Sequence, residues 1–97
     1  MAVDDCHTLD DVRAQIDRID RQIVTLMAER QGYVSQAGRF KPSADAVFDA
    51  TRFEAIIAKV RGLAAELGAS ADVVDQTYRA MVTGFTELEE DEVRRRG

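Results

Sequence analysis

The sequence predicts an all-α protein, and three observations lead to this fold class. The 97 residues include one proline and six glycines, far fewer turn residues than a β-sandwich or β-barrel needs. Apolar residues recur at spacings of three and four along most of the chain, which is the period of an amphipathic helix. No stretch of about 18 apolar residues occurs, so none of the helices is expected to span a membrane.

Composition predicts one soluble domain over residues 1–97 and excludes several function classes. A hydrophobic fraction of 45% is too high for a disordered chain. A net charge of −5 argues against a general nucleic-acid binder. The acidic N-terminus lacks the apolar stretch of a secretory signal, so a cytoplasmic location is expected. The single cysteine, Cys6, excludes an internal disulfide and a cysteine-based zinc site.

The first helix is predicted over residues 9–38. Thr8 can cap its start, and Gly38 and Pro42 mark its end because a proline disfavours helix at the residue before it. Residues 39–48 read as a loop. The helix has a heptad-like seam made of Leu9, Val12, Ile16, Ile19, Ile23, Leu26, Arg30, Tyr33 and Ala37.

Two further helices follow. The second is expected to begin after its cap, Asp49, and to stop at Gly68, and the third is capped by Ser70 or Asp72. The apolar face of the second comprises Phe53, Ile56, Ile57, Val60, Leu63, Ala64 and Leu67. That of the third comprises Val74, Tyr78, Met81, Phe85 and Leu88. The third helix ends in EEDEVRRR, which we interpret as a solvated terminus whose acids pair with its bases.

The length of the first helix predicts an oligomer. Thirty residues make a helix of about 45 Å, whereas a compact globule of this size is about 32 Å across. The helix would therefore leave part of its apolar seam exposed. A second chain must cover that seam, most simply in a twofold homodimer packed along residues 9–38.

Arg30 lies within the apolar seam, between Leu26 and Tyr33. A buried guanidinium is costly unless an anion meets it. The anion could be a ligand, or it could be a structural partner on a neighbouring helix, such as Glu89 or Asp49. Spacing alone leaves the two alternatives open.

Lys41 follows Arg30 by 11 residues. If the helix continued that far, the two cations would share one face, about 16 Å apart along the axis. The small side chains of Val34 and Ala37 would leave a gap between them that suits a small anion. The alternative is a solvated loop lysine beside Pro42.

Three more charged residues are candidates for the same site. Arg13 is about 25 Å from Arg30 and about 100° around the helix, so one chain cannot use both on one small ligand, although an antiparallel dimer could. Otherwise Arg13 is a surface residue. Glu89 flanks the apolar stripe of the third helix, either as the partner of Arg30 or as a protonated acid. Arg52 opens the second helix, as another cation of the site or as a solvated residue.

The sequence offers no nucleophile or cofactor motif to accompany these cations. His7 and Cys6 lack partners at a spacing that suggests catalysis, and no Gly-rich phosphate loop, Ser/His/Asp arrangement or metal cluster occurs. Neither a metal nor a cofactor is therefore expected. Such a site suits chemistry that needs only binding and electrostatics.

The chain resembles the all-helical (class II) chorismate mutases, and in particular their isochorismate pyruvate lyase branch. The most specific stretches are DDCHTLDDVRAQIDRIDRQIVTLMAER and YVSQAGRFK, and the resemblance covers about residues 5–90. It implies an intertwined homodimer of three-helix protomers with two active sites. The substrate would be a small dicarboxylate, with no nucleic-acid or membrane partner.

The resemblance also implies roles for individual residues. Arg13 would reach into the partner's site and hold a substrate carboxylate, while Arg30 would bind the carboxylate of the enolpyruvyl side chain. Lys41 would sit at the ether oxygen, where negative charge develops as the C–O bond breaks. Glu89 would donate a hydrogen bond to the same oxygen, and Arg52 matches the arginine that opens helix two in the mutases.

The resemblance does not decide whether the substrate is chorismate or isochorismate. Asp49 joins Arg52 among the expected substrate-binding residues. Mutases usually carry a glutamate after this arginine, but Phe53 stands here, as in the lyase branch. Phe85 replaces a polar residue one turn before Glu89. Glu89 itself stands where the lyase has glutamine, and it fits mutases that work with a protonated glutamate.

The activity that we predict first is the Claisen rearrangement of chorismate to prephenate. The alternative is cleavage of isochorismate to salicylate and pyruvate in the same pocket. A hypothesis from another functional class is that the protein is a non-catalytic helical dimer in which Arg30 forms an internal ion pair. The product could serve aromatic amino acid biosynthesis, a siderophore or a specialised metabolite.

Overall fold

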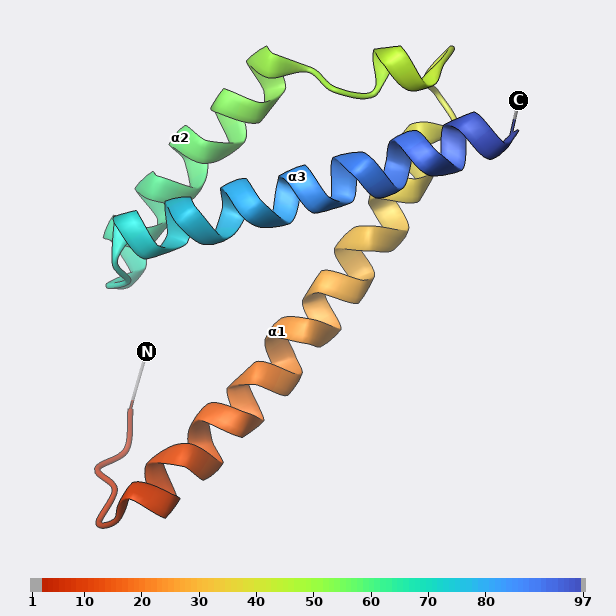
Figure 1. Cartoon of the computed structure of the whole chain (residues 1–97). Coiled ribbons are helices and arrows are strands. Elements are labelled where there is room, and N and C mark those ends of the chain that lie inside the picture. The colour runs from red at the N-terminus through yellow and green to blue at the C-terminus, as the bar shows by residue number, and fades with distance from the viewer. Residues whose placement is uncertain (1–2, 97) are drawn as a thin grey trace. The chain divides into compact units, whose positions relative to one another are not determined.

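The computed structural model describes residues 3–96, and every regular element in that range is helical. The long helix α1 covers Leu9–Gly38, a short 3₁₀ helix η1 covers Ala44–Ala46, α2 covers Ala50–Leu67 and α3 covers Ala71–Arg96 (Figure 1). The predicted all-α fold with three helices and one long N-terminal helix is therefore confirmed. The expected loop at 39–48 is confirmed too, except that η1 interrupts it.

The chain divides into two compact units, Met1–Tyr33 and Val34–Gly97, and the boundary falls inside α1. In the first unit, the Thr8 hydroxyl oxygen accepts a hydrogen bond from the backbone N–H of Asp11 at 3.0 Å. Thr8 is thus the N-terminal cap that the sequence predicts.

The apolar seam of α1 is exposed in the first unit. Its seven large apolar side chains are each 40–65% exposed. They are Leu9, Val12, Ile16, Ile19, Ile23, Leu26 and Tyr33. A contiguous apolar stripe of this kind is typical of an interaction surface.

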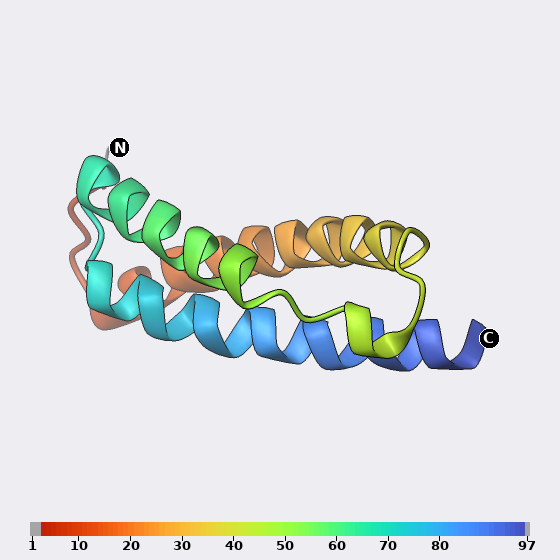
Figure 2. The same cartoon turned by 90° about the horizontal axis from the view of Figure 1, so that it is seen from above.

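The second unit is built on a hairpin of α2 and α3 (Figure 2). Asp49 accepts a hydrogen bond from the backbone N–H of Arg52 at 3.0 Å, which caps α2. Gly68 ends α2 with φ of 80°, a left-handed conformation that glycine adopts without steric cost. The Ser70 hydroxyl oxygen accepts from the N–H of Val73, so the cap of α3 is Ser70 rather than Asp72.

The core of the second unit is small and aliphatic. Its buried apolar residues come from α2, α3 and the segment after η1: Val47, Ile57, Val60, Ala64, Val82 and Val93. Positions 57, 60 and 64 follow the predicted three-four spacing of the second helix. This core anchors the elements that carry the site described below.

An ion-pair network also joins α2 to α3. Arg61 contacts Asp72 at 2.9 Å and Asp75 at 3.0 Å, while Arg79 contacts Asp75 at 2.6 Å and Glu54 at 3.4 Å. Asp75 connects the two arginines, and its side chain is only 17% exposed. Hydrogen bonds from Arg79 and then from Arg61 lower the pKa of Asp75, although partial burial opposes them.

The network predicts a dependence of stability on acid pH. A carboxyl whose pKa is lower in the folded protein stabilises the fold fully above its unfolded pKa of about 4, and the contribution disappears as pH falls through the lower folded value. Asp75→Asn should therefore reduce stability at pH 7 and flatten its decline below about pH 4. Urea unfolding at several pH values measures this. If the stability of the Asp75→Asn variant fell as steeply below about pH 4 as that of the parent, Asp75 would not be the source of this pH dependence.

Candidate active site around Lys41 and Glu89

Lys41 and Glu89 meet in the second unit. The Lys41 ammonium nitrogen lies 3.1 Å from Glu89 Oε2 and 3.4 Å from the carbonyl oxygen of Val47. Glu89 is only 7% exposed, while the Lys41 side chain is 30% exposed. The cation therefore stays accessible to solvent beside a buried carboxyl group, and its ammonium can donate a hydrogen bond to a polar oxygen of a ligand.

The end of α1 brings Lys41 to this position. The helix ends at Gly38, and the N–H of Lys41 then donates to the Gly38 carbonyl at 3.2 Å. The condition for a shared helical face with Arg30 is thus not met. The turn after Gly38, rather than helical periodicity, determines where Lys41 lies.

Gly38 permits α3 to approach closely. A Cβ atom at this position would lie 3.1 Å from Glu89 Cγ and 3.2 Å from Val93 Cγ2. Both neighbours are buried side chains of α3, and Glu89 is held by its ion pair. Neither can move away freely, so glycine is required here by packing, in addition to its role at the helix end.

Gly38→Ala is expected to destabilise the fold and to displace Glu89. Overpacking costs about 1–3 kcal/mol, whereas the better helix propensity of alanine returns up to about 1 kcal/mol. The matched control is Gly62→Ala in α2, where a new Cβ would meet nothing within 4 Å, so the propensity gain should appear alone. Thermal unfolding of both variants compares them. Equal stabilisation by the two substitutions would contradict the packing argument.

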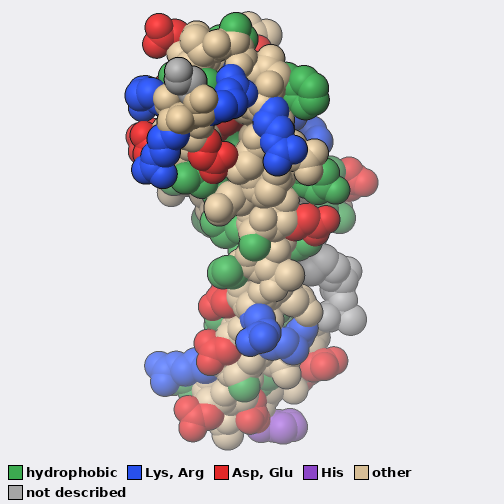
Figure 3. Space-filling view, turned by 90° about the vertical axis from the view of Figure 1, so that its right-hand side faces the viewer, with side chains coloured by type: hydrophobic (Ala, Val, Ile, Leu, Met, Phe, Trp, Pro, Cys, Tyr) green, Lys and Arg blue, Asp and Glu red, His purple; other side chains and the backbone are tan. Residues whose placement is uncertain are grey.

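Sequence reasoning missed Arg96. Of the arginines that end α3, Arg94 and Arg95 pair with Asp91, as expected of a self-paired helix terminus. Arg96 differs, because its guanidinium donates to the carbonyl oxygens of Gly38 at 3.0 Å and Lys41 at 2.7 Å. Lys and Arg side chains gather at this end of the second unit (Figure 3). No sequence signal separates Arg96 from its two neighbours.

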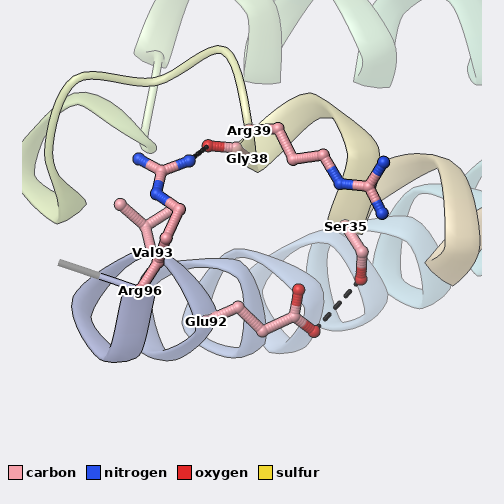
Figure 4. Close-up of a pocket in the computed structure, with 6 residues that line it drawn as sticks. All are labelled: Ser35, Gly38, Arg39, Glu92, Val93 and Arg96. Carbon is pink, nitrogen blue, oxygen red and sulfur yellow. Dashed lines mark hydrogen bonds between the residues drawn. The ribbon is translucent and has the colours of Figure 1, made fainter.

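A small pocket adjoins this contact. Its volume is about 170 Å³, and Ser35 on its wall is hydrogen-bonded to Glu92 at 3.1 Å (Figure 4). The lining residues are Ser35, Gly38, Arg39, Glu92, Val93 and Arg96. The two sides of the pocket thus come from the end of α1 and the last turns of α3.

The other predicted site residues are distributed over both units. Arg13 is exposed and Arg30 is half-buried, and both belong to the part of α1 in the first unit. Asp49 and Arg52 are exposed at the start of α2 in the second unit, where the Asp49 side chain serves as the cap. Among the predicted site residues of the second unit, Lys41 thus contacts Glu89, and Asp49 caps α2 at Arg52.

Phe53 gives the start of α2 an apolar character. Its ring centroid lies 6.0 Å from that of Phe48 at an angle of 51°, and the Arg79 guanidinium carbon lies 5.7 Å from the Phe53 centroid. A cation over an aromatic face is favourable. Phe53 is therefore part of a packed aromatic cluster, with no carboxylate at its position to accept a hydrogen bond from a ligand hydroxyl.

Within residues 3–96, no group of three or more His, Cys, Asp or Glu side chains could hold a metal ion. In the same range, no helix is both long enough and apolar enough to cross a membrane.

The chain is similar to a family of proteins and to individual known proteins. The family described as Chorismate mutase type II matches residues 12–90. An isochorismate pyruvate lyase of Pseudomonas aeruginosa is 35% identical over 79 residues, which cover 81% of this chain and 78% of that protein. The T-protein of Haemophilus influenzae is 36% identical over 72 residues, or 73% of this chain, but the matched region spans only 19% of that longer protein. The chain belongs to the chorismate mutase type II family.

Proposed function

We propose that this protein catalyses the rearrangement of chorismate to prephenate without a cofactor. The observation that carries the proposal is the 3.1 Å contact between the Lys41 ammonium and buried Glu89. In the rearrangement, the ether C–O bond breaks as a new C–C bond forms within the same molecule. Negative charge develops on the ether oxygen, where the Lys41 ammonium stabilises it, and Glu89 adds a hydrogen bond when its carboxyl group carries a proton.

The remaining polar residues act by binding. Arg30 and Arg13 take the two substrate carboxylates, and Asp49 and Arg52 contribute at the mouth of the site. Holding a flexible substrate in its reactive, folded conformer contributes several kcal/mol to the barrier reduction. No group in the chain needs to form a covalent bond to the substrate, which agrees with the lack of a predicted nucleophile.

We also propose that residues 1–97 form a single domain and that two chains form a homodimer. The family match runs from residue 12 to 90 and so crosses the boundary between the two units, which supports one domain. The exposed seam of α1 supports the dimer, because burying it would remove a large apolar area from water. In this assembly Arg13 enters the site of the partner chain.

A second candidate reaction is the cleavage of isochorismate to salicylate and pyruvate. Phe53 favours it, because an apolar cluster replaces the carboxylate expected of a mutase at that position. The isochorismate pyruvate lyase of Pseudomonas aeruginosa, of which this chain covers 78%, also favours it. The ether C–O bond breaks here too, and a hydrogen passes from the ring to the enolpyruvyl carbon, so the same cation would be used.

Separate incubations with chorismate and isochorismate test the proposal. Prephenate from chorismate supports the first reaction, and salicylate with pyruvate from isochorismate supports the second. If neither compound reacts, both proposals fail. The protein is then a non-catalytic helical module, and thermal stabilisation by prephenate would separate a binding protein from a purely structural one.

Glu89→Gln tests the role of the buried acid. Glutamine keeps the size of the side chain and can donate a hydrogen bond through its amide, so appreciable turnover should remain, whereas Glu89→Ala should lose most of it. Steady-state kinetics with both compounds measure this. Equal turnover by the two variants would remove hydrogen bonding by residue 89 from the mechanism.

A further inference from the structure

Arg96 joins the end of α3 to the segment that carries Lys41. Its guanidinium donates to the carbonyl oxygens of Gly38 and Lys41 at 3.0 Å and 2.7 Å, and Figure 4 shows the side chain reaching the Gly38 carbonyl. We infer that Arg96 is a positioning residue that holds Lys41 at the reacting oxygen. The inference rests on the proposed function, since it assigns a task to a group of that same site.

The chemistry of a helix end explains why an arginine binds here. The last carbonyl groups of a helix lack partners within the helix and carry partial negative charge. The last turn of α1 contains no basic residue of its own. Arg96 supplies the missing positive charge from α3, and its planar fork has donors for two carbonyl groups at once.

With Arg96 in place, Lys41 is held at three points. Its carbonyl accepts from Arg96, its N–H donates to Gly38, and its ammonium contacts Glu89. Without Arg96, the carbonyl would be released and the segment after Gly38 could move relative to α3. Lys41 would then reach Glu89 from a less defined backbone position.

The neighbouring arginines show that the contact is specific. Arg95 has an 80% exposed side chain and contacts Asp91 of the same helix at 3.5 Å, and Arg94 also contacts Asp91. The family match ends at residue 90, so Arg96 lies beyond the part of the chain that the family defines. The three arginines are thus equivalent in sequence but differ in the second unit of the structure.

The test compares Arg96→Ala with its matched control, Arg95→Ala, in the full chain. We expect Arg96→Ala to lower kcat by about ten- to a hundredfold, because small misplacements of a catalytic group have effects of this size. Arg95→Ala should retain the parental kcat. Arg96→Lys should recover only part of the loss, since an ammonium cannot reproduce the planar fork. Full recovery by lysine, or an unchanged kcat in Arg96→Ala, would overturn the inference.

A double-mutant cycle separates positioning from general destabilisation. If Arg96 acts through Lys41, Arg96→Ala should cause no further loss of kcat in a Lys41→Ala background. Losses that multiply would show that Arg96 acts elsewhere and would overturn the inference. All four proteins of the cycle are assayed below their unfolding transitions, so that loss of folded protein cannot imitate the result.

Amide hydrogen exchange tests the positioning without any substrate. The N–H groups of Phe40 and Lys41 donate to Ala37 and Gly38, and they should exchange faster in Arg96→Ala than in Arg95→Ala. Unchanged exchange overturns the inference whatever the activity. Faster exchange in a protein that turns over neither chorismate nor isochorismate supports the structural role of Arg96, and the failure then belongs to the proposed function alone.

Discussion

Replacement of Lys41 by alanine is expected to lower kcat by about 10²–10³-fold, the loss that follows removal of one group that stabilises a developing oxyanion. The ammonium lies next to Glu89, on the side of the contact that remains partly exposed to solvent. In the proposed reaction no other cation takes its place at the ether oxygen. The loss should appear in kcat more than in KM, because the charge develops only in the transition state.

The control for this variant must separate lost chemistry from lost stability. Lys41→Ala leaves the nearly buried Glu89 without its partner, and removing one member of a fully buried ion pair costs about 3–5 kcal/mol. A Lys41→Met/Glu89→Gln double variant removes both members of the pair and should fold while remaining impaired. Lys59→Ala, at an exposed position of α2, should keep full turnover. A folded Lys41→Ala protein with only a mild loss of kcat would refute the placement of Lys41.

The helix boundaries could be predicted from the sequence because short-range chemistry determines them. Thr8 and Asp49 accept backbone hydrogen bonds at helix starts, and Gly68 adopts the left-handed conformation that ends α2. Each of these interactions involves residues within a few positions of each other. The sequence alone does not decide between Ser70 and Asp72, since both are good caps and only the path of the turn selects one of them.

The contacts at the site could not be predicted in the same way, because they join residues far apart in the sequence. The meeting of Lys41 with Glu89 depends on where α1 ends and on the close approach of α3 to Gly38. Helical periodicity pointed instead to a shared face of Lys41 and Arg30, which requires a helix that continues past Gly38. The role of Arg96 depends on carbonyl groups about 55 positions away along the chain. Neither composition nor local sequence pattern predicts such a contact.

Mixing two inactive variants is expected to restore activity if Arg13 acts in trans. In a dimer of Arg13→Ala and Lys41→Ala chains, one of the two sites receives both substitutions and the other receives neither. Random pairing makes about half of the dimers mixed, so about a quarter of the parental activity should return. Each variant is purified alone, and the two are then unfolded, mixed, refolded and assayed together.

The matched control for this mixture uses residues that share one protomer. Lys41 and Glu89 are in contact within the second unit, so every site of a mixed Lys41→Ala and Glu89→Ala dimer has one defect, and no activity should return. Recovery in the first mixture but not in the second requires a site that two chains build together. Activity that stays absent from both mixtures, with dimers verified by sedimentation, would mean that Arg13 does not complete the partner's site. The exposed seam of α1 would then serve association alone.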